Sequence, residues 1–172
     1  MRASERQADP RSVPDPVALD CGIRLRGSID LVEVHRSGLM RVTDHKTGKA
    51  DGSAGQIIGG GAALQPLLYA LAAEKLFAGQ AAISAGRLYF CTARGGFSEL
   101  EVALDDQARA AASQVAGTIG GAVEGGFLPA YPAKDQCAWC DYRVVCGPHE
   151  ERRITRKPPA EVEPLVRLRE AP

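Results

Sequence analysis

The stretch RVTDHKTGKA, from Arg41 to Ala50, constrains the fold more than any other part of the chain. Its apolar start follows a turn at Ser37-Gly38, so we predict a strand from Leu39 to about Lys46. Residues two apart on a strand share a face. Asp44 and Lys46 are therefore expected to point one way and His45 the other, which sets an acid beside an amine at the end of a strand.

The preceding segment, IRLRGSIDLVEVH, alternates apolar and polar residues from Ile23 onward. This pattern predicts one strand with a single buried face. The short turn that follows predicts an antiparallel hairpin with the next strand. Such pairing can bring Asp30 beside Asp44.

Two carboxylates that converge with an ammonium group repel each other unless a cation offsets their charge. Oxygen ligands of this kind suit Mg²⁺ or Mn²⁺. Lys46 could then hold the attacking water or the scissile phosphate, as in metal-dependent phosphodiester hydrolysis. Taken alone, the Asp44 and Lys46 pair would more often be a solvated ion pair on a strand surface than a catalytic pair.

The rest of the chain predicts a mixed α/β arrangement, in the order two strands, helix, two strands, helix. A Gly-rich loop at 50–61 precedes the first helix. The expected elements are a helix from about Ala62 to Phe77, strands at 83–93 and 97–104, and a helix that Asp105 caps and that ends near Glu124.

Three short motifs follow one another in the order G-x-x-D, D-x-K-T-G and Q-x-x-x-Y. They consist of Gly27 and Asp30, then Asp44, Lys46, Thr47 and Gly48, then Gln65 and Tyr69. In this order and spacing the chain resembles the RecB-like branch of the PD-(D/E)XK nuclease superfamily. It is similar to the nuclease domain of AddB and related recombination helicase-nucleases.

This resemblance implies a restriction-endonuclease-like mixed sheet flanked by helices. It implies that Asp30, Asp44 and the carbonyl of His45 bind Mg²⁺ or Mn²⁺ and that Lys46 is catalytic. Gln65 and Tyr69 are four residues apart and share a helix face. The resemblance places both at the DNA or at the edge of the active site, whereas from the residues alone they could be a helix start and a core residue.

The C-terminal, Cys-rich segment CAWCDYRVVC has the spacing C-x2-C-x5-C, which favours a metal-binding site. Its cysteines are Cys137, Cys140 and Cys146. Iron–sulfur members of the RecB-like branch imply a 4Fe–4S cluster here, with a fourth Cys upstream. Cys21 is the only Cys before the motifs. Zinc with His149 as the fourth ligand, and an incomplete site, are the alternatives.

We divide the chain into a flexible lead-in at 1–18, a nuclease core at 19–130, a Cys cluster at 131–150 and a charged tail at 151–172 with one or two helical turns. The core lacks the upstream helix that supplies a metal ligand in the family. The 21 basic and 21 acidic residues give no net charge, so any basic surface must be local. No secretory signal or membrane span is visible, which predicts a cytoplasmic location and no membrane partner.

Three functions remain open from the sequence. The first is a nuclease domain that cleaves DNA, single-stranded DNA above all, within a longer DNA repair or recombination protein that has a helicase domain or subunit. The second is a catalytically degenerate DNA-binding or scaffold module. The third is a zinc-stabilised interaction module, which would leave the ordered motifs without explanation.

Overall fold

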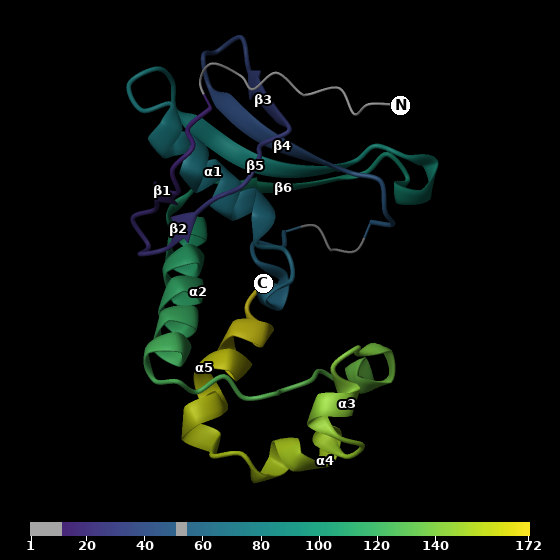
Figure 1. The fold of residues 1–172 in the computed structure, drawn as a ribbon. Helices are drawn as coiled ribbons and strands as arrows, with labels where there is room; N and C mark the ends of the chain where they lie inside the picture. The colour runs from purple at the N-terminus through teal and green to yellow at the C-terminus, as the bar shows by residue number, and fades with distance from the viewer. Residues whose placement is uncertain (1–11, 51–54) are drawn as a thin grey trace.

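A four-stranded mixed sheet forms the centre of the structure, a computed structural model that describes residues 12–50 and 55–172 (Figure 1). The predicted lead-in at 1–18 and the Gly-rich loop at 50–61 thus lie partly outside the described residues. The strands, in spatial order, are β3 (Leu31–Val34), β4 (Met40–Lys46), β5 (Ile83–Phe90) and β6 (Glu99–Ala103). The outer pairs are antiparallel and β4–β5 is parallel. The predicted mixed α/β fold is confirmed.

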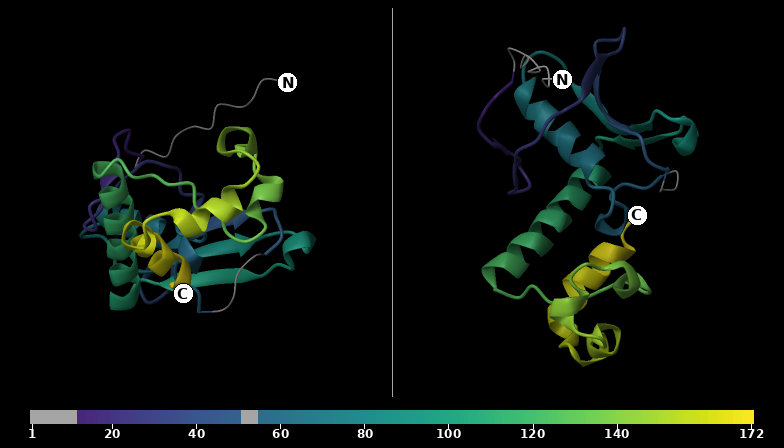
Figure 2. Two further views of the ribbon diagram at one scale, coloured as in Figure 1. Left: turned by 90° about the horizontal axis from the view of Figure 1, so that it is seen from below. Right: turned by 45° about the vertical axis from the view of Figure 1, so that its right-hand side comes forward.

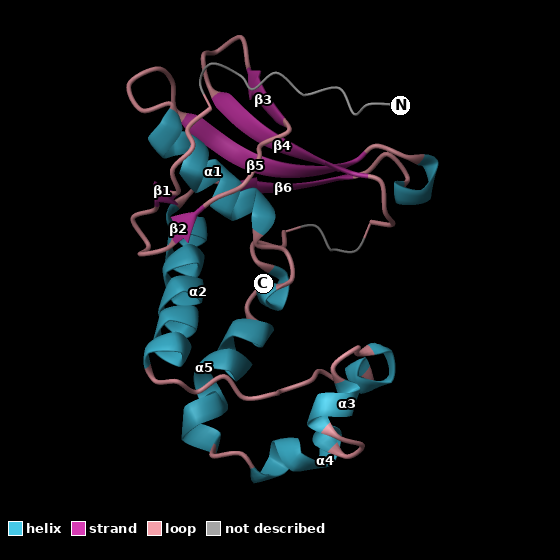
Figure 3. Ribbon diagram, in the orientation of Figure 1, coloured by secondary structure: helices cyan, strands magenta, loops and turns pink. Residues whose placement is uncertain are grey.

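Helix α1 (Gln65–Leu76) makes the crossover between the parallel strands β4 and β5, as such strands require. Helix α2 (Asp106–Glu124) follows β6 and begins where Asp105 accepts a hydrogen bond from the Ala108 amide at 2.9 Å. Figure 3 shows α1 against the sheet, with α2 and the C-terminal helices extending away from it. No helix within the described part of the chain has the length and apolar character needed to cross a membrane.

The start of α1 lies directly on the sheet because Gly86 of β5 has no side chain. A Cβ atom added at Gly86 would lie 1.9 Å from the carbonyl oxygen of Pro66. Pro66 occupies the opening turn of α1, where its missing N–H leaves no intrahelical bond unmade. The helix therefore approaches β5 more closely than any larger residue at this position would permit.

The single strand predicted from Ile23 is wrong, because the chain leaves extended pairing between Arg26 and Asp30. A short strand β2 (Arg24–Leu25) pairs with β1 (Val17–Ala18), and β3 begins only at Leu31. The alternating apolar residues serve two different cores. Ile23 and Leu25 pack against the cluster formed with α2, whereas Ile29 and Val32 pack against the cluster between α1 and β4.

The C-terminal segment is more than a charged tail with one or two helical turns. It contains α5 (Pro159–Glu170), whose Leu168 joins the core cluster that includes Ile58. The Ile58 amide donates to the carbonyl oxygen of Pro172 at 2.8 Å, so the second half of the Gly-rich loop holds the C-terminal residue (Figure 2). The reason lies in the residues at 162, 165, 166 and 168, which give α5 an apolar side despite its charges.

Shorter elements complete the fold. They are η1 (Gly59–Gly61), η2 (Ala93–Gly95), η3 (Gln136–Trp139), α3 (Arg143–Cys146), α4 (Glu150–Arg153) and η4 (Ile154–Arg156).

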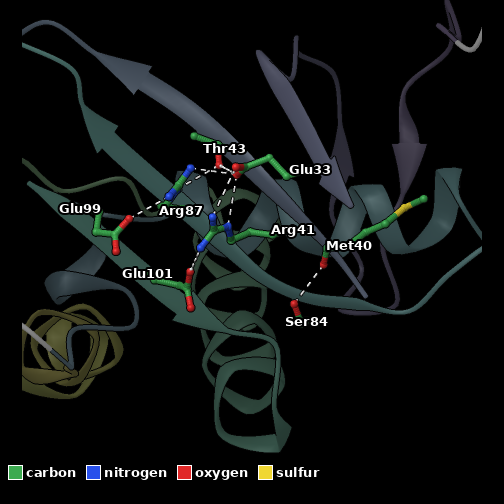
Figure 4. A network of polar contacts seen from close by, with 8 residues as sticks. All are labelled: Glu33, Met40, Arg41, Thr43, Ser84, Arg87, Glu99 and Glu101. Atoms are coloured by element: carbon green, nitrogen blue, oxygen red, sulfur yellow. Dashed lines mark hydrogen bonds and ion pairs between the residues drawn. The ribbon is translucent and has the colours of Figure 1, made fainter. Parts of the chain in front are cut away.

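The face of the sheet opposite α1 carries a network of ion pairs (Figure 4). The Glu33 carboxylate accepts hydrogen bonds from Thr43 Oγ1 at 2.6 Å and from Arg87 at 2.8 Å, and pairs with Arg41 at 3.2 Å. Arg41 and Arg87 continue to Glu101 and Glu99 on β6. Partial burial opposes ionisation, yet the bonds from Thr43 and Arg41 and the two guanidinium charges hold the pKa of Glu33 below its ordinary range.

We expect Gly86→Ala to lower the free energy of unfolding by about 1–3 kcal/mol, the usual cost of overpacking. The added methyl group meets the backbone of Pro66, which cannot move without shifting α1. Gly117→Ala is the matched control, since nothing lies within 4 Å of that position on α2. It should stabilise the helix by about 0.5–1 kcal/mol. Urea unfolding measures both, and equal stability of the Gly86→Ala and wild-type proteins would contradict the close packing.

The lowered pKa of Glu33 makes part of the stability depend on pH. Its contribution is present above the ordinary pKa of a glutamate, about 4.3, and is lost as the pH falls through the lower folded-state value. We expect the free energy of unfolding of Glu33→Gln to decline less than that of wild type between about pH 5 and pH 3. Glu124→Gln, at the exposed end of α2, should follow the wild-type slope in the same denaturation series.

Candidate active site

The end of β4 brings Asp44 and Lys46 together on the face that meets α1. Asp44 is only 7% exposed, and its Oδ2 atom lies 2.6 Å from Lys46 Nζ. His45 points to the opposite, solvent-exposed face, where its ring meets Tyr89 edge-on with the ring centroids 6.1 Å apart. The strand alternation thus separates the acid–amine pair from the His side chain.

Gln65 joins the two charged groups. Its Nε2 atom donates to Asp44 Oδ1 at 2.7 Å, and its Oε1 atom accepts from Lys46 Nζ at 2.6 Å. Gln65 is the first residue of α1, directly before the Pro66 that rests on Gly86. The close packing of helix on strand is therefore what places the amide between the carboxylate and the ammonium.

Asp30 lies against β4 at His45, and its Oδ2 atom is 3.8 Å from His45 Nδ1. It directly precedes β3, and the pairing of Leu31 with Thr43 continues to set position 30 opposite position 44. The Asp30 carboxylate accepts a hydrogen bond from the His45 amide at 2.9 Å. A second acid is thus held against the backbone of β4, between the positions of Asp44 and Lys46.

Tyr69 lies one helical turn after Gln65 and braces the segment that carries Asp30. Its hydroxyl would be 3.0 Å from a Cβ atom at Gly27, and its ring packs against the cluster that contains Val42 and Ala70. The Gly of the first motif thus leaves room for the Tyr of the third. Tyr69 and Asp30 both line a groove of about 440 Å³, bordered on one side by Arg26.

The turn after Lys46 is anchored by a segment that the sequence analysis did not single out. The Cys91 amide donates to the carbonyl of Lys46 at 3.0 Å, and Thr92 Oγ1 donates to the carbonyl of Thr47 at 3.2 Å. Gly95 packs so closely that a Cβ atom there would lie 2.9 Å from the Gly48 oxygen. A Thr followed by Gly95-Gly96 is a turn signal that could have indicated this anchor.

The acidic groups of the site have the chemistry that Mg²⁺ or Mn²⁺ prefers. Asp44 Oδ2 is buried without a hydrogen-bond partner and meets only the charge of Lys46. Carboxylate and carbonyl oxygens are the ligands of these hard cations. Across residues 12–50 and 55–172, no three His, Cys, Asp or Glu side chains are grouped around one metal position. Metal binding by Asp30, Asp44 and the backbone carbonyl of His45 stays a prediction.

Cys137 lies in η3, Cys140 directly follows it, and Cys146 is the last residue of α3. All three have free thiols. Partial burial and the nearby Glu151 carboxylate raise the pKa of Cys137, which disfavours its thiolate. Trp139, between the first two cysteines, is 89% exposed and so does not pack over the thiols. The described side chains form no metal-binding group here, so a metal at these cysteines stays a prediction.

The comparison with known families agrees with this geometry. The family model of the PD-(D/E)XK nuclease superfamily matches residues 1–147, a span that includes the whole sheet, α1 and all three motifs. No curated protein is significantly similar to the chain. A family match over most of the chain, together with an acid–amine pair at the end of a central strand, shows that this chain belongs to the PD-(D/E)XK nuclease superfamily.

Proposed function

We propose that this nuclease-type domain hydrolyses phosphodiester bonds in DNA, single-stranded DNA above all, with Mg²⁺ or Mn²⁺. The observation that carries the proposal is the contact of Asp44, Lys46 and Gln65, in which one buried carboxylate oxygen has a cationic neighbour and no hydrogen bond. A surface ion pair would not need to bury its acid or to receive an amide from a separate helix.

Asp30, Asp44 and the carbonyl of His45 would hold the ion. When bound, it supplies an activated water and neutralises charge on the phosphate. Lys46 places its ammonium beside Asp44, where it stabilises the negative charge that develops during hydrolysis. Gln65 orients that ammonium through the 2.6 Å hydrogen bond, so the charge is in place before the reaction.

We further propose that the domain belongs to the RecB-like branch and acts in DNA repair or recombination, joined to a helicase domain or subunit. The three motifs in order support the branch, as does the contact between Gly27 of the first motif and Tyr69 of the third. A catalytically degenerate DNA-binding module would keep the same fold, and cleavage by the wild-type chain distinguishes the two.

We expect Lys46→Ala to reduce cleavage of labelled DNA by on the order of 10²–10³-fold, the usual effect of removing one preorganised charge donor. Asp44→Ala should be at least as damaging, because a metal ligand is lost with it. Lys75→Ala is the matched control, since this lysine lies on α1 and pairs with Asp20 at 2.6 Å. The assay uses Mg²⁺ or Mn²⁺, with EDTA as the blank.

Wild-type activity in Lys46→Ala would contradict the assignment of this lysine. Failure of the wild-type chain to cleave any DNA in Mg²⁺ or Mn²⁺ would favour the degenerate module. Circular dichroism of each variant separates loss of catalysis from loss of fold, and Lys46 is half-buried at the rim, so its truncation should leave the core intact.

The spacing of Cys137, Cys140 and Cys146 supports a structural metal, which we propose is a 4Fe–4S cluster or a zinc ion with His149. Protein purified without oxygen should be brown in the first case. In the second it should be colourless with about one zinc per chain. Cys140→Ser should lose the metal, whereas Cys91→Ser should keep it. Metal-free wild-type protein after anaerobic purification with iron and zinc supplied would contradict the site.

A further inference from the structure

An exposed aromatic residue stands beside the candidate active site, at the tip of the β5–β6 hairpin. We define the hairpin tip as residues 91–98. Its Phe97 side chain is 61% exposed, although burial of a phenylalanine ring is favourable. Figure 1 shows that η2, within the tip, lies at the end of the sheet where β4 also ends. The bonds from Cys91 and Thr92 tie the tip to the residues that follow Asp44.

The backbone at Phe97 is held in a conformation that its side chain disfavours. Its φ is 51°, in the left-handed region, where a bulky residue is an outlier. The Phe97 amide donates to the Thr92 carbonyl at 3.2 Å, and Ser98 Oγ donates to the Gly95 carbonyl at 2.7 Å. Gly would adopt this φ without strain, as Gly96 does at 67°. Neither packing nor backbone geometry therefore accounts for a phenylalanine at this position.

Basic residues lie in and next to the hairpin tip, since Gly95 packs against the carbonyl oxygen of Gly48, the residue before Lys49. Arg94 in the tip and Lys49 after the anchored turn are both exposed, and neither has an ion pair with any acid in the part of the chain that the structure describes. Glu99, the acid closest in sequence to Phe97, is already paired with Arg87 at 2.8 Å. Lys46, which pairs with Asp44 and whose carbonyl accepts from the Cys91 amide, is a third cation next to the tip. In a chain without net charge, this local excess complements a phosphodiester backbone.

We propose that the hairpin tip binds single-stranded DNA, with Phe97 stacking on an unpaired base and Arg94 and Lys49 contacting the adjacent phosphates. This inference rests on the proposed nuclease function and names its substrate-binding element. An exposed ring flanked by cations is the usual means of holding a single strand, because each base offers a face for stacking. In a duplex those faces are covered by neighbouring base pairs, so the tip selects unpaired substrate.

The test measures binding of the full chain to a fluorescein-labelled oligonucleotide that contains 2-aminopurine, in EDTA so that no cleavage occurs. Phe97→Gly should weaken binding by about 5- to 150-fold and abolish quenching of the 2-aminopurine. Its stability should not fall, because Gly suits the φ of 51°. Phe97→Tyr should bind like wild type. Val123→Ala, a control equally exposed at 61% on α2, should change nothing.

The phosphate contacts have a separate readout. Arg94→Gln should reduce the slope of log K against log salt by about 0.7, the value for one phosphate of a single strand. Lys49→Gln should do the same. An unchanged slope in both variants would remove the cations from the binding element.

Wild-type affinity and quenching in Phe97→Gly would overturn the proposal. So would self-association of the wild-type chain in sedimentation that Phe97→Gly abolishes without any change in DNA binding, since the ring would then be a protein contact. The nuclease function fails independently. Stacking that depends on Phe97 without cleavage in Mg²⁺ or Mn²⁺ keeps this inference and rejects that function, whereas cleavage of DNA without such stacking does the reverse.

Discussion

The close approach of α1 to β5 at Pro66 and Gly86 is the contact on which the rest of the site depends. Without a side chain at Gly86, the first turn of the helix lies on the sheet, and Gln65 falls between Asp44 and Lys46. A helix displaced outward by even one methyl group would carry the amide away from both partners. The geometry of the candidate site is thus a consequence of helix–sheet packing. Whatever weakens that packing also displaces Gln65 from its two partners.

The electrostatics of the site depend on the Asp44 oxygen that Gln65 does not reach. Gln65 satisfies Oδ1 of Asp44, whereas Oδ2 is buried with only the ammonium of Lys46 beside it. Burying a carboxylate oxygen without a hydrogen bond is unfavourable, so this arrangement is one that a divalent cation would relieve. A second acid, Asp30, is held against the His45 amide on the neighbouring residue of β4. The opposite face of the sheet shows the contrast, since there the half-buried Glu33 accepts hydrogen bonds from Thr43 and Arg87 and pairs with Arg41.

Local patterns predicted the strand at Met40–Lys46, the helix after Asp105 and the mixed class of the fold, because alternation and capping are read from neighbouring residues. They were wrong where the cause is distant in sequence. Ile23 and Ile29 alternate in step but pack in different cores, so the break between them is invisible to periodicity. Leu168 is buried only because Ile58 lies across from it. The Gln65 amide bridge was equally hidden, since it depends on a glycine 21 residues further along the chain that no motif contains.

The candidate site lies at the end of the sheet and not within it, because Asp44 and Lys46 are among the last residues of β4. Inside the sheet, β4 pairs with β3 over Met40–Thr43 and with β5 along its length, and Val42 on the α1 side is buried. At Lys46 the ladder ends, and the chain turns under the anchor formed by Cys91 and Thr92. The carboxylate of Asp44 is therefore buried, whereas the ammonium of Lys46 at the strand end stays about one-third exposed. A strand that ended two residues earlier would expose Asp44 to water and weaken its hold on a cation, and one that ended later would close the approach. The hairpin tip at 91–98 holds the end of β4 through the bonds of Cys91 and Thr92, so the same segment fixes the limit of the strand and carries the proposed DNA-binding ring.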